Sequence, residues 1–291
     1  MENNVVLQVN NLVKKYGNNR GVDGISFSVK KGEIFGLIGP NGAGKSTTIK
    51  SILGIVKKTS GEIKVNGLSI DENEKEIKGH IGYLPSECNF YNNMTVKKLL
   101  NYSQKLYGTF NISIDEYGKR LDLDLNKKIE DLSYGNKKKV GIIDTILSNG
   151  ELIILDEATG GLDPLVQEEF FRIIEELRQH GKTIVYSAHV LTEIQRLCHR
   201  VGIIKEGKMI KVEDINNVNK INLKRVSLIS NDIDLEKIKG ISDYNKDNNR
   251  ITFTYSGNPS ELIRHLSKID IKDIKIEEPS LEEIFLKYYE R

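Results

Sequence analysis

The chain has 291 residues, which is enough for one large domain or for a domain with an appendage. Its 43 Lys and Arg residues nearly balance 41 Asp and Glu residues, and the resulting formal charge of +2 argues against a dedicated nucleic-acid-binding protein. No window is apolar enough for a membrane span, and the two cysteines, Cys88 and Cys198, are too few for a disulfide framework. We therefore expect a globular chain that is soluble in a reducing cytoplasm.

Short β-branched segments alternate with helical stretches over the first two thirds of the chain. The predicted strands are Val5–Val9, Ile25–Val29, Ile34–Ile38, Leu152–Leu155 and Thr183–Tyr186. Strands that alternate with helices indicate an α/β fold with a mostly parallel central sheet. The strands Ile34–Ile38 and Leu152–Leu155 are almost entirely apolar, so we expect them at the centre of the sheet with helices on both faces.

A P-loop motif follows the first of these apolar strands. Residues Gly39–Thr47 read Gly-Pro-Asn-Gly-Ala-Gly-Lys-Ser-Thr and stand between a strand and a helical run, as the motif requires. Backbone N–H groups of such a loop surround phosphate oxygens. Lys45 is expected on the β- and γ-phosphates of ATP, and Ser46 on Mg²⁺. The other expected nucleotide contacts are Gly39, Asn41, Gly42, Gly44 and Thr47.

The segment between about Leu84 and Asn149 is mostly helical, which predicts a helical insertion (about 84–149) within the larger domain. One face of its clearest helix, Thr95–Tyr107, has apolar or small residues at i, i+3 and i+4 spacing, namely Val96, Leu99, Leu100, Ser103 and Leu106.

Two carboxylates stand at the end of the second apolar strand. Asp156 is expected to hold the Mg²⁺ shell, and Glu157 is expected to polarise the attacking water as a general base. A P-loop and a carboxylate pair fit many ATP-hydrolysing enzymes, so the residues between and after them decide the class.

A smaller α+β domain is predicted at residues 221–291, after a polar linker at Glu213–Lys220 that ends a larger domain of residues 1–215. Its predicted strands and helices are Arg225–Ser230, Arg250–Tyr255, the helix Pro259–Lys268, Ile271–Glu277 and the helix Pro279–Tyr289. Asn245–Arg250 is expected to be a solvated hairpin loop.

A short loop before the carboxylate pair gives the chain its family resemblance. It reads Leu132, Ser133, Tyr134, Gly135 and Asn136. Here the chain resembles the nucleotide-binding subunits of ATP-binding cassette (ABC) transporters, whose signature loop reads Leu-Ser-Gly-Gly-Gln; Tyr134 and Asn136 depart from it. The resemblance implies that Ser133, Gly135 and Asn136 contact ATP held by a second subunit. Taken alone, the loop also fits an ordinary helix cap.

Further positions match the same family. Asp163, after Gly161 and Leu162, resembles the D-loop aspartate, and His189 resembles the switch histidine that contacts the γ-phosphate and the catalytic water. Tyr16 resembles the aromatic residue that stacks on adenine. At the Q-loop, Ser86 stands where the family usually has Gln; a serine reaches the metal only through a water, and Glu87 is the candidate substitute.

The resemblance also implies partners. Because each site needs the P-loop of one cassette and the signature loop of another, two identical or paralogous cassettes would meet around two ATP molecules with two-fold symmetry. A separate membrane permease would place the chain at the cytoplasmic face of the membrane, with no nucleic acid involved. The tail Glu278–Phe285 is similar to that of the bacterial exporter branch that handles drugs, antibiotics and peptides.

The alternative from another functional class is a soluble ABC ATPase that acts in DNA repair or translation. Such relatives usually carry two cassettes in one chain or a long coiled coil, and this sequence has one cassette and no sustained heptads. A simple P-loop kinase would require neither the loop at Ser133 nor the D-loop.

Overall fold

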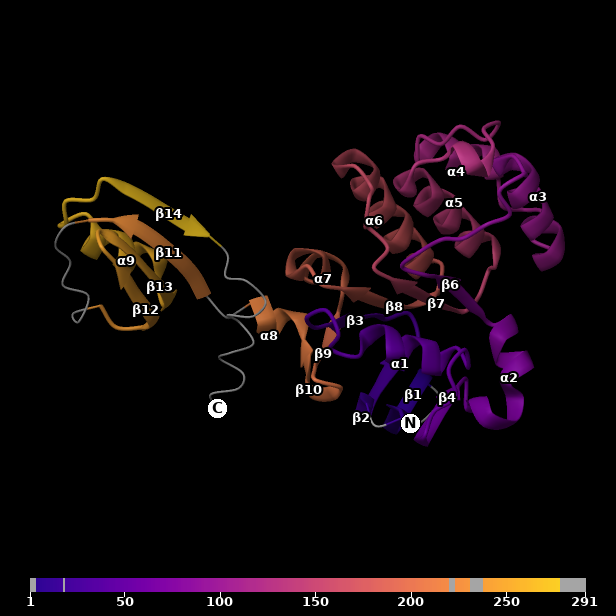
Figure 1. Cartoon of the computed structure of the whole chain (residues 1–291), viewed down its shortest axis with the longest axis horizontal. Helices are drawn as coiled ribbons and strands as arrows, with labels where there is room; N and C mark the ends of the chain where they lie inside the picture. The colour runs from indigo at the N-terminus through magenta and orange to yellow at the C-terminus, as the bar shows by residue number, and fades with distance from the viewer. Residues whose placement is uncertain (1–3, 18, 220–222, 231–237, 278–291) are drawn as a thin grey trace. The chain divides into compact units, whose positions relative to one another are not determined.

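The computed structural model describes residues 4–17, 19–219, 223–230 and 238–277 of the chain. Contacts between Cα atoms divide the chain into two compact units, residues 1–215 and residues 216–291 (Figure 1). Each unit has its own cluster of buried apolar side chains.

A six-stranded sheet forms the centre of the larger unit, with the strand order β10-β9-β3-β8-β7-β6. Its strands in chain order are β3 (Ile34–Ile38), β6 (Ile81–Leu84), β7 (Leu152–Asp156), β8 (Thr183–Ala188), β9 (Arg200–Lys205) and β10 (Lys208–Asp214). All neighbouring strands are parallel except β9 and β10. Every residue of β3, β7 and β8 is buried, as expected for strands covered on both faces. The predicted α/β fold with a mostly parallel sheet is confirmed.

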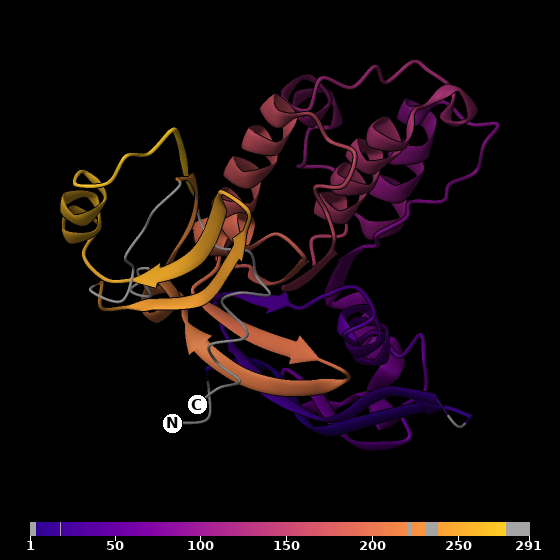
Figure 2. The same ribbon diagram turned by 60° about the vertical axis from the view of Figure 1, so that its left-hand side comes forward.

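The first strands of the chain belong to a second, antiparallel sheet. Strands β1 (Val5–Tyr16) and β2 (Asn19–Lys30) pair as a hairpin, seen as long indigo strands in Figure 2. The strands β4 (Ser60–Val65) and β5 (Leu68–Ser69) complete the order β2-β1-β4-β5. The predicted strands at Val5–Val9 and Ile25–Val29 are therefore present, but they are longer than predicted and lie outside the parallel sheet.

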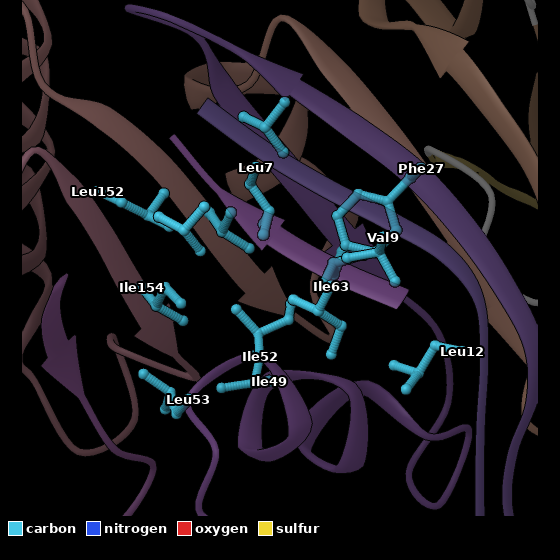
Figure 3. Close-up of a cluster of buried hydrophobic side chains, with 14 of the residues drawn as sticks. Leu7, Val9, Leu12, Phe27, Ile49, Ile52, Leu53, Ile63, Leu152 and Ile154 are labelled. Carbon is cyan, nitrogen blue, oxygen red and sulfur yellow. The ribbon is translucent and has the colours of Figure 1, made fainter. Parts of the chain in front are cut away.

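Helix α1 (Lys45–Ile52) joins the cores of the two sheets. Figure 3 shows Ile52 of α1 in one cluster with Ile63 of the antiparallel sheet and Ile154 of the central sheet. The same buried cluster contains further side chains from both sheets and from the end of α1, namely Leu7, Val9, Phe27, Ile49, Leu53 and Leu152. Because α1 packs against both sheets, the position of the loop that precedes it is fixed.

Between β6 and β7 the chain forms α3 (Val96–Tyr107), α4 (Ile114–Arg120) and α5 (Tyr134–Leu147), which group on one side of the central sheet in Figure 1. The Thr95 hydroxyl caps α3 by accepting a hydrogen bond from the backbone N–H of Lys98. Most of the predicted stripe on α3 is buried, but Leu106 is 67% exposed. The prediction is wrong there because α3 ends one residue later, where Gly108 (φ 70°) reverses the chain.

The remaining helices of this unit are α2 (Ile70–Gly79), the 3₁₀ turn η1 (Ile129–Asp131), α6 (Pro164–Gln179) and α7 (Leu191–Leu197). Pro164 occupies the first turn of α6, as predicted. Within the part of the chain that the structure describes, every helix is too short or too polar to cross a membrane.

The smaller unit contains an antiparallel sheet of order β12-β13-β11-β14 and the helix α9. Its elements are β11 (Leu223–Ile229), β12 (Ile241–Asp247), β13 (Arg250–Ser256), α9 (Pro259–Leu266) and β14 (Asp273–Glu277). Strand β12 was not predicted, because it is a polar edge strand with no apolar alternation. As a result, the predicted loop at Asn245–Arg250 shrinks to a tight turn at Asn248 (φ 52°).

The segment between the two units is more regular than predicted. Strand β10 continues to Asp214, and the short helix α8 spans Ile215–Asn219, so residues 213–219 form regular secondary structure. The boundary between the two units, after Ile215, falls within this segment. The predicted helix Pro279–Tyr289 and the tail Glu278–Phe285 lie outside the described residues.

Candidate functional site

The predicted P-loop connects β3 to α1. Its backbone runs so close to other segments that side chains are excluded: a Cβ on Gly39 would lie 2.1 Å from the carbonyl oxygen of Ile204. Gly44 precedes α1 with φ 110°, a conformation that side chains other than glycine rarely adopt. The loop therefore needs its glycines for geometry, and the first turn of α1 presents free N–H groups toward it. Asn41 and Gly42 are exposed at its tip.

The side chain of Lys45 folds back into this loop. Its Nζ donates hydrogen bonds to the carbonyl oxygens of Gly39 (2.8 Å) and Pro40 (3.2 Å), and only 4% of the residue is exposed. Burial lowers the pKa of Lys45, while the carboxylates of Glu157 and Asp156 oppose that shift. The loop therefore contains a buried cation with two carboxylates near it.

The carboxylate of Asp156 is completely buried at the end of β7. Its Oδ1 accepts a hydrogen bond from the Ser187 hydroxyl at 2.5 Å, and these residues face each other across β7 and β8. Its Oδ2 has no hydrogen-bond partner among the residues that the structure describes. A buried anionic oxygen without a donor is costly, and a cation would compensate it. Hydroxyl and carboxylate oxygens, as on Ser46 and Asp156, are ligands that Mg²⁺ accepts, so this donor set fits the ion.

The side chain of Glu157 lies between two groups that could act on a phosphate. Its Oε1 is 3.9 Å from Nζ of Lys45 and 3.9 Å from Nδ1 of His189. Glu157 is 32% exposed and His189 is 57% exposed, so both reach solvent, where a substrate could approach. Glu157 also has φ 49°, and its N–H donates to the carbonyl oxygen and to the hydroxyl of Ser187. The turn after β7 is thus held in an unusual conformation that aims the carboxylate at this space.

Tyr16 lies near the other end of the P-loop. It is 46% exposed at the end of β1, and a Cβ on Gly21 would come within 2.9 Å of its ring and 3.2 Å of the Thr47 side chain. Only the backbone of Gly21 lies between the Tyr16 ring and the Thr47 side chain. The exposed ring of Tyr16 therefore lies beside the P-loop, where a planar base could stack on it.

The predicted signature loop caps α5. The Ser133 hydroxyl accepts a hydrogen bond from the backbone N–H of Asn136 (3.3 Å). A Cβ on Gly135 would lie 2.2 Å from the carbonyl oxygen of Gly161, so this loop touches the predicted D-loop of the same chain. Asp163 caps α6 in turn by accepting from the N–H of Val166 (3.0 Å).

At the predicted Q-loop, the backbone of Ser86, and not its side chain, makes the hydrogen bonds to the helical segment. The carbonyl oxygen of Ser86 accepts hydrogen bonds from the Tyr134 hydroxyl (2.9 Å) and from Nζ of Lys138 (2.5 Å). Glu87 follows, and its charge acts on both Tyr134 and Lys138.

Sequence reasoning missed a half-buried carboxylate network beside the site. Glu193 of α7 accepts hydrogen bonds from the hydroxyls of Thr159 (2.8 Å) and Tyr186 (2.5 Å). It thereby ties the turn after Glu157 to the helix after His189. No local pattern marks Glu193, whereas Ser187 could have been found by placing the ends of two parallel strands side by side.

The sequence matches two family models. The model described as ABC transporter matches residues 22–160, and the model of the C-terminal domain of ATP-binding proteins like DrrA1-3 matches residues 211–289. The chain is 35% identical to the bacitracin transport ATP-binding protein BcrA of Bacillus licheniformis, over 97% of this chain and 96% of that protein. It is 39% identical to the linearmycin resistance ATP-binding protein LnrL of Bacillus subtilis, over 71% of this chain and 68% of that protein.

A solved structure described as the ATP-binding subunit of an ABC transporter has the same fold. It superposes with a TM-score of 0.65 at 29% sequence identity, over 74% of this chain and 92% of that chain. These relatives favour the transporter over the soluble ATPase of DNA repair or translation. The chain therefore belongs to the ATP-binding, ATP-hydrolysing subunits of ABC transporters and carries a DrrA-like C-terminal domain.

Proposed function

We propose that this chain powers the export of an antibiotic or a similar drug or peptide through a separate membrane permease. Support comes from BcrA, a bacitracin transport protein that matches along almost the whole of both chains, and from the DrrA-like C-terminal domain. The observation that carries the ATPase part of the proposal is the approach of Lys45 and His189 to the same oxygen of Glu157.

The P-loop is proposed to bind the phosphates of ATP. Lys45 donates hydrogen bonds to the carbonyl oxygens of Gly39 and Pro40. When ATP binds, its ammonium group would donate to oxygens of the β- and γ-phosphates instead, so that anionic acceptors replace two neutral ones. Backbone N–H groups at Gly42, Gly44 and the start of α1 would surround the same phosphates. The ring of Tyr16 is proposed to stack on the adenine.

Ser46 and Asp156 are proposed to hold Mg²⁺, which, when bound, neutralises charge on the phosphate oxygens. The Ser187 hydroxyl keeps the Asp156 carboxylate oriented, so that Oδ2 is left for the ion. Ser86 would contribute at the same end of the sheet only through a water, and Glu87 is the candidate substitute for the family's Gln.

Glu157 is proposed as the general base. A water between its carboxylate and the γ-phosphate would give up a proton to Oε1 as its oxygen attacks the γ-phosphorus, and the bond from that phosphorus to the oxygen shared with the β-phosphate would break, which releases ADP and inorganic phosphate. His189, 3.9 Å from the same carboxylate, would orient that water and the γ-phosphate.

Each site is proposed to need a second cassette, identical or paralogous. Ser133 caps α5, and Gly135 and Asn136 lie in its first turn; these residues are proposed to contact ATP bound to the partner subunit, and Asp163 would lie at the interface between the two subunits. The cassette pair would work at the cytoplasmic face of the membrane and would need no nucleic acid.

The experiment is expression of this chain with its neighbouring permease in a susceptible bacterium, followed by minimal inhibitory concentrations of bacitracin and other membrane-active antibiotics. We expect the pair to raise the inhibitory concentration of at least one compound, and Lys45→Ala to abolish the effect. Resistance that does not depend on Lys45, or failure of chain and permease to copurify from detergent, would contradict the proposal.

A further inference from the structure

Two side chains of α5 hold the backbone that follows β6. The Tyr134 hydroxyl donates to the carbonyl oxygen of Ser86, and Nζ of Lys138 donates to the carbonyl oxygens of Ser86 and Pro85 (3.0 Å). Tyr134 and Lys138 are four residues apart, so they stand one turn apart on the same face of the helix. The Lys138 ammonium also lies 5.8 Å from the centre of the Tyr134 ring.

The cation in this cluster is fully buried. Lys138 has no exposed surface, and burial lowers its pKa, while Asp156, Glu157 and Glu87 are among the groups that act in the opposite direction. A buried ammonium is stable only when its protons have acceptors, and the two carbonyl oxygens supply them. The backbone at residues 85–86 is therefore fixed by a charge-assisted contact.

The ring of Tyr134 makes a third connection, to the predicted D-loop. A Cβ on Gly161 would lie 2.5 Å from a ring carbon of Tyr134, so the ring rests directly on the Gly161 backbone. A Cβ on the neighbouring Gly135 would lie 2.2 Å from the Gly161 carbonyl oxygen, so these two backbones are also in close contact. Three segments that are distant in sequence thus meet at Tyr134: the backbone after β6, the start of α5 and the predicted D-loop, which follows Glu157 along the chain.

We propose that Tyr134 and Lys138 are positioning residues that join the subunit's own catalytic turn to the signature loop that it offers to its partner. The inference rests on the proposed function, because it requires that Ser133 and Glu157 of one chain serve two different ATP molecules. Tyr134 and Gly135 lie against Gly161, four residues after Glu157, and three hydrogen bonds also hold α5 to the backbone after β6. A displacement of the catalytic turn at Glu157 is therefore expected to move Ser133 with it. ATP in one site thereby favours the arrangement that the other site needs, which is positive coupling.

The test is Tyr134→Phe, which removes one hydroxyl and keeps the ring against Gly161. Hydrolysis is measured against ATP concentration, with Tyr102→Phe as the control, because Tyr102 is an exposed tyrosine on α3. For two coupled sites, the wild-type Hill coefficient approaches about 2, and we expect Tyr134→Phe to lower it to about 1. Loss of one hydrogen bond also predicts an approximately three- to tenfold fall in kcat. The nucleotide affinity of the isolated chain should stay unchanged, and its melting temperature should fall by no more than a few degrees.

The outcomes separate this inference from the proposed function. A wild-type protein that hydrolyses ATP cooperatively, with Tyr134→Phe showing the same Hill coefficient, overturns the inference alone. A lower kcat at an unchanged Hill coefficient also contradicts the inference, because Tyr134 would then support the fold of each site without coupling the two sites. A wild-type protein without cooperativity, whose Glu157→Gln variant forms no dimer in ATP with itself or a paralogue, overturns both.

Discussion

At the scale of single residues, the site depends on one oxygen without a donor. The hydroxyl of Ser187 satisfies Oδ1 of Asp156, and Oδ2 has no partner within the described part of the chain. The two oxygens of one carboxylate thus have different environments, which favours a cation at one and a hydroxyl at the other.

Asp156→Asn tests this division. The amide can keep the hydrogen bond from Ser187 but carries no negative charge, so we expect the Mg²⁺ concentration for half-maximal hydrolysis to rise about 10- to 100-fold. Binding of ATP without Mg²⁺ should be retained. Asp115→Asn, an exposed aspartate paired with Lys97, is the control. An unchanged Mg²⁺ requirement in Asp156→Asn would remove this residue from the metal site.

The sequence allowed the residues of this site to be proposed because each motif is contiguous and sits at the end of an apolar strand. Contacts between distant motifs could not be foreseen in the same way. The bond from Tyr134 to Ser86 joins residues 48 positions apart, and it depends on how α5 rotates against the sheet. A tyrosine in a polar loop gives no signal of that contact.

At the scale of elements, one arginine fastens the helical segment to α6. Arg120 at the end of α4 forms two hydrogen bonds to the carboxylate of Glu176 (2.7 and 2.8 Å) and one to Glu169 (2.6 Å). These contacts raise the pKa of Arg120, the bonds to Glu176 most of all. Paired planar contacts of this kind restrict the relative movement of the two helices.

Replacement of Arg120 by Met should lower the free energy of unfolding by about 1–2 kcal/mol, a value reduced for partial exposure. The control is Arg172→Met, because Arg172 also pairs with Glu169 but is largely exposed. Chemical denaturation checks both variants. Equal effects of the two substitutions would show that the bond to Glu176 contributes nothing.

Strand β6 carries a tyrosine that links pH to stability. Burial raises the pKa of Tyr83 from 10.0 to about 12, and Asp156 adds to the shift. Between these pH values the folded chain keeps a proton that the unfolded chain has lost, so this contribution to stability is present below pH 10 and disappears as pH rises toward 12.

Tyr83→Phe should therefore flatten the fall in unfolding free energy between about pH 10 and pH 12, by at most about 1.4 kcal/mol per pH unit. Tyr102→Phe serves as the exposed control. Identical slopes for wild type and Tyr83→Phe in denaturant titrations would contradict the raised pKa.

Helices and strands could be predicted where burial imposes a hydrophobic pattern on the sequence, and exposed elements without such a pattern could not. Strands β3 and β7 follow from uninterrupted apolar residues, whereas β12 is polar, exposed and defined only by pairing with β13. The prediction that Leu106 belongs to the buried face of α3 was wrong for a related reason. The hydrophobic character of a residue does not reveal whether it is covered in the last turn of a helix, and Leu106 is exposed there.

At the scale of the whole molecule, the chain consists of a catalytic unit and a smaller unit of different fold class. The central sheet places the ends of β3, β7 and β8 side by side, which brings Lys45, Glu157 and His189 together although they are far apart in sequence. Because these strands are parallel, their carboxyl ends lie together, and the residues that follow them form one site.

The most direct measurement of the central claim is the rate of ATP hydrolysis by Glu157→Gln at saturating ATP and Mg²⁺. The amide keeps the size of the side chain but cannot accept the proton of water, so we predict a fall in kcat of about 10²- to 10⁴-fold with ATP binding intact. Glu168→Gln, a surface carboxylate paired with Arg196, should hydrolyse ATP like the wild type. Wild-type turnover in Glu157→Gln would contradict the account.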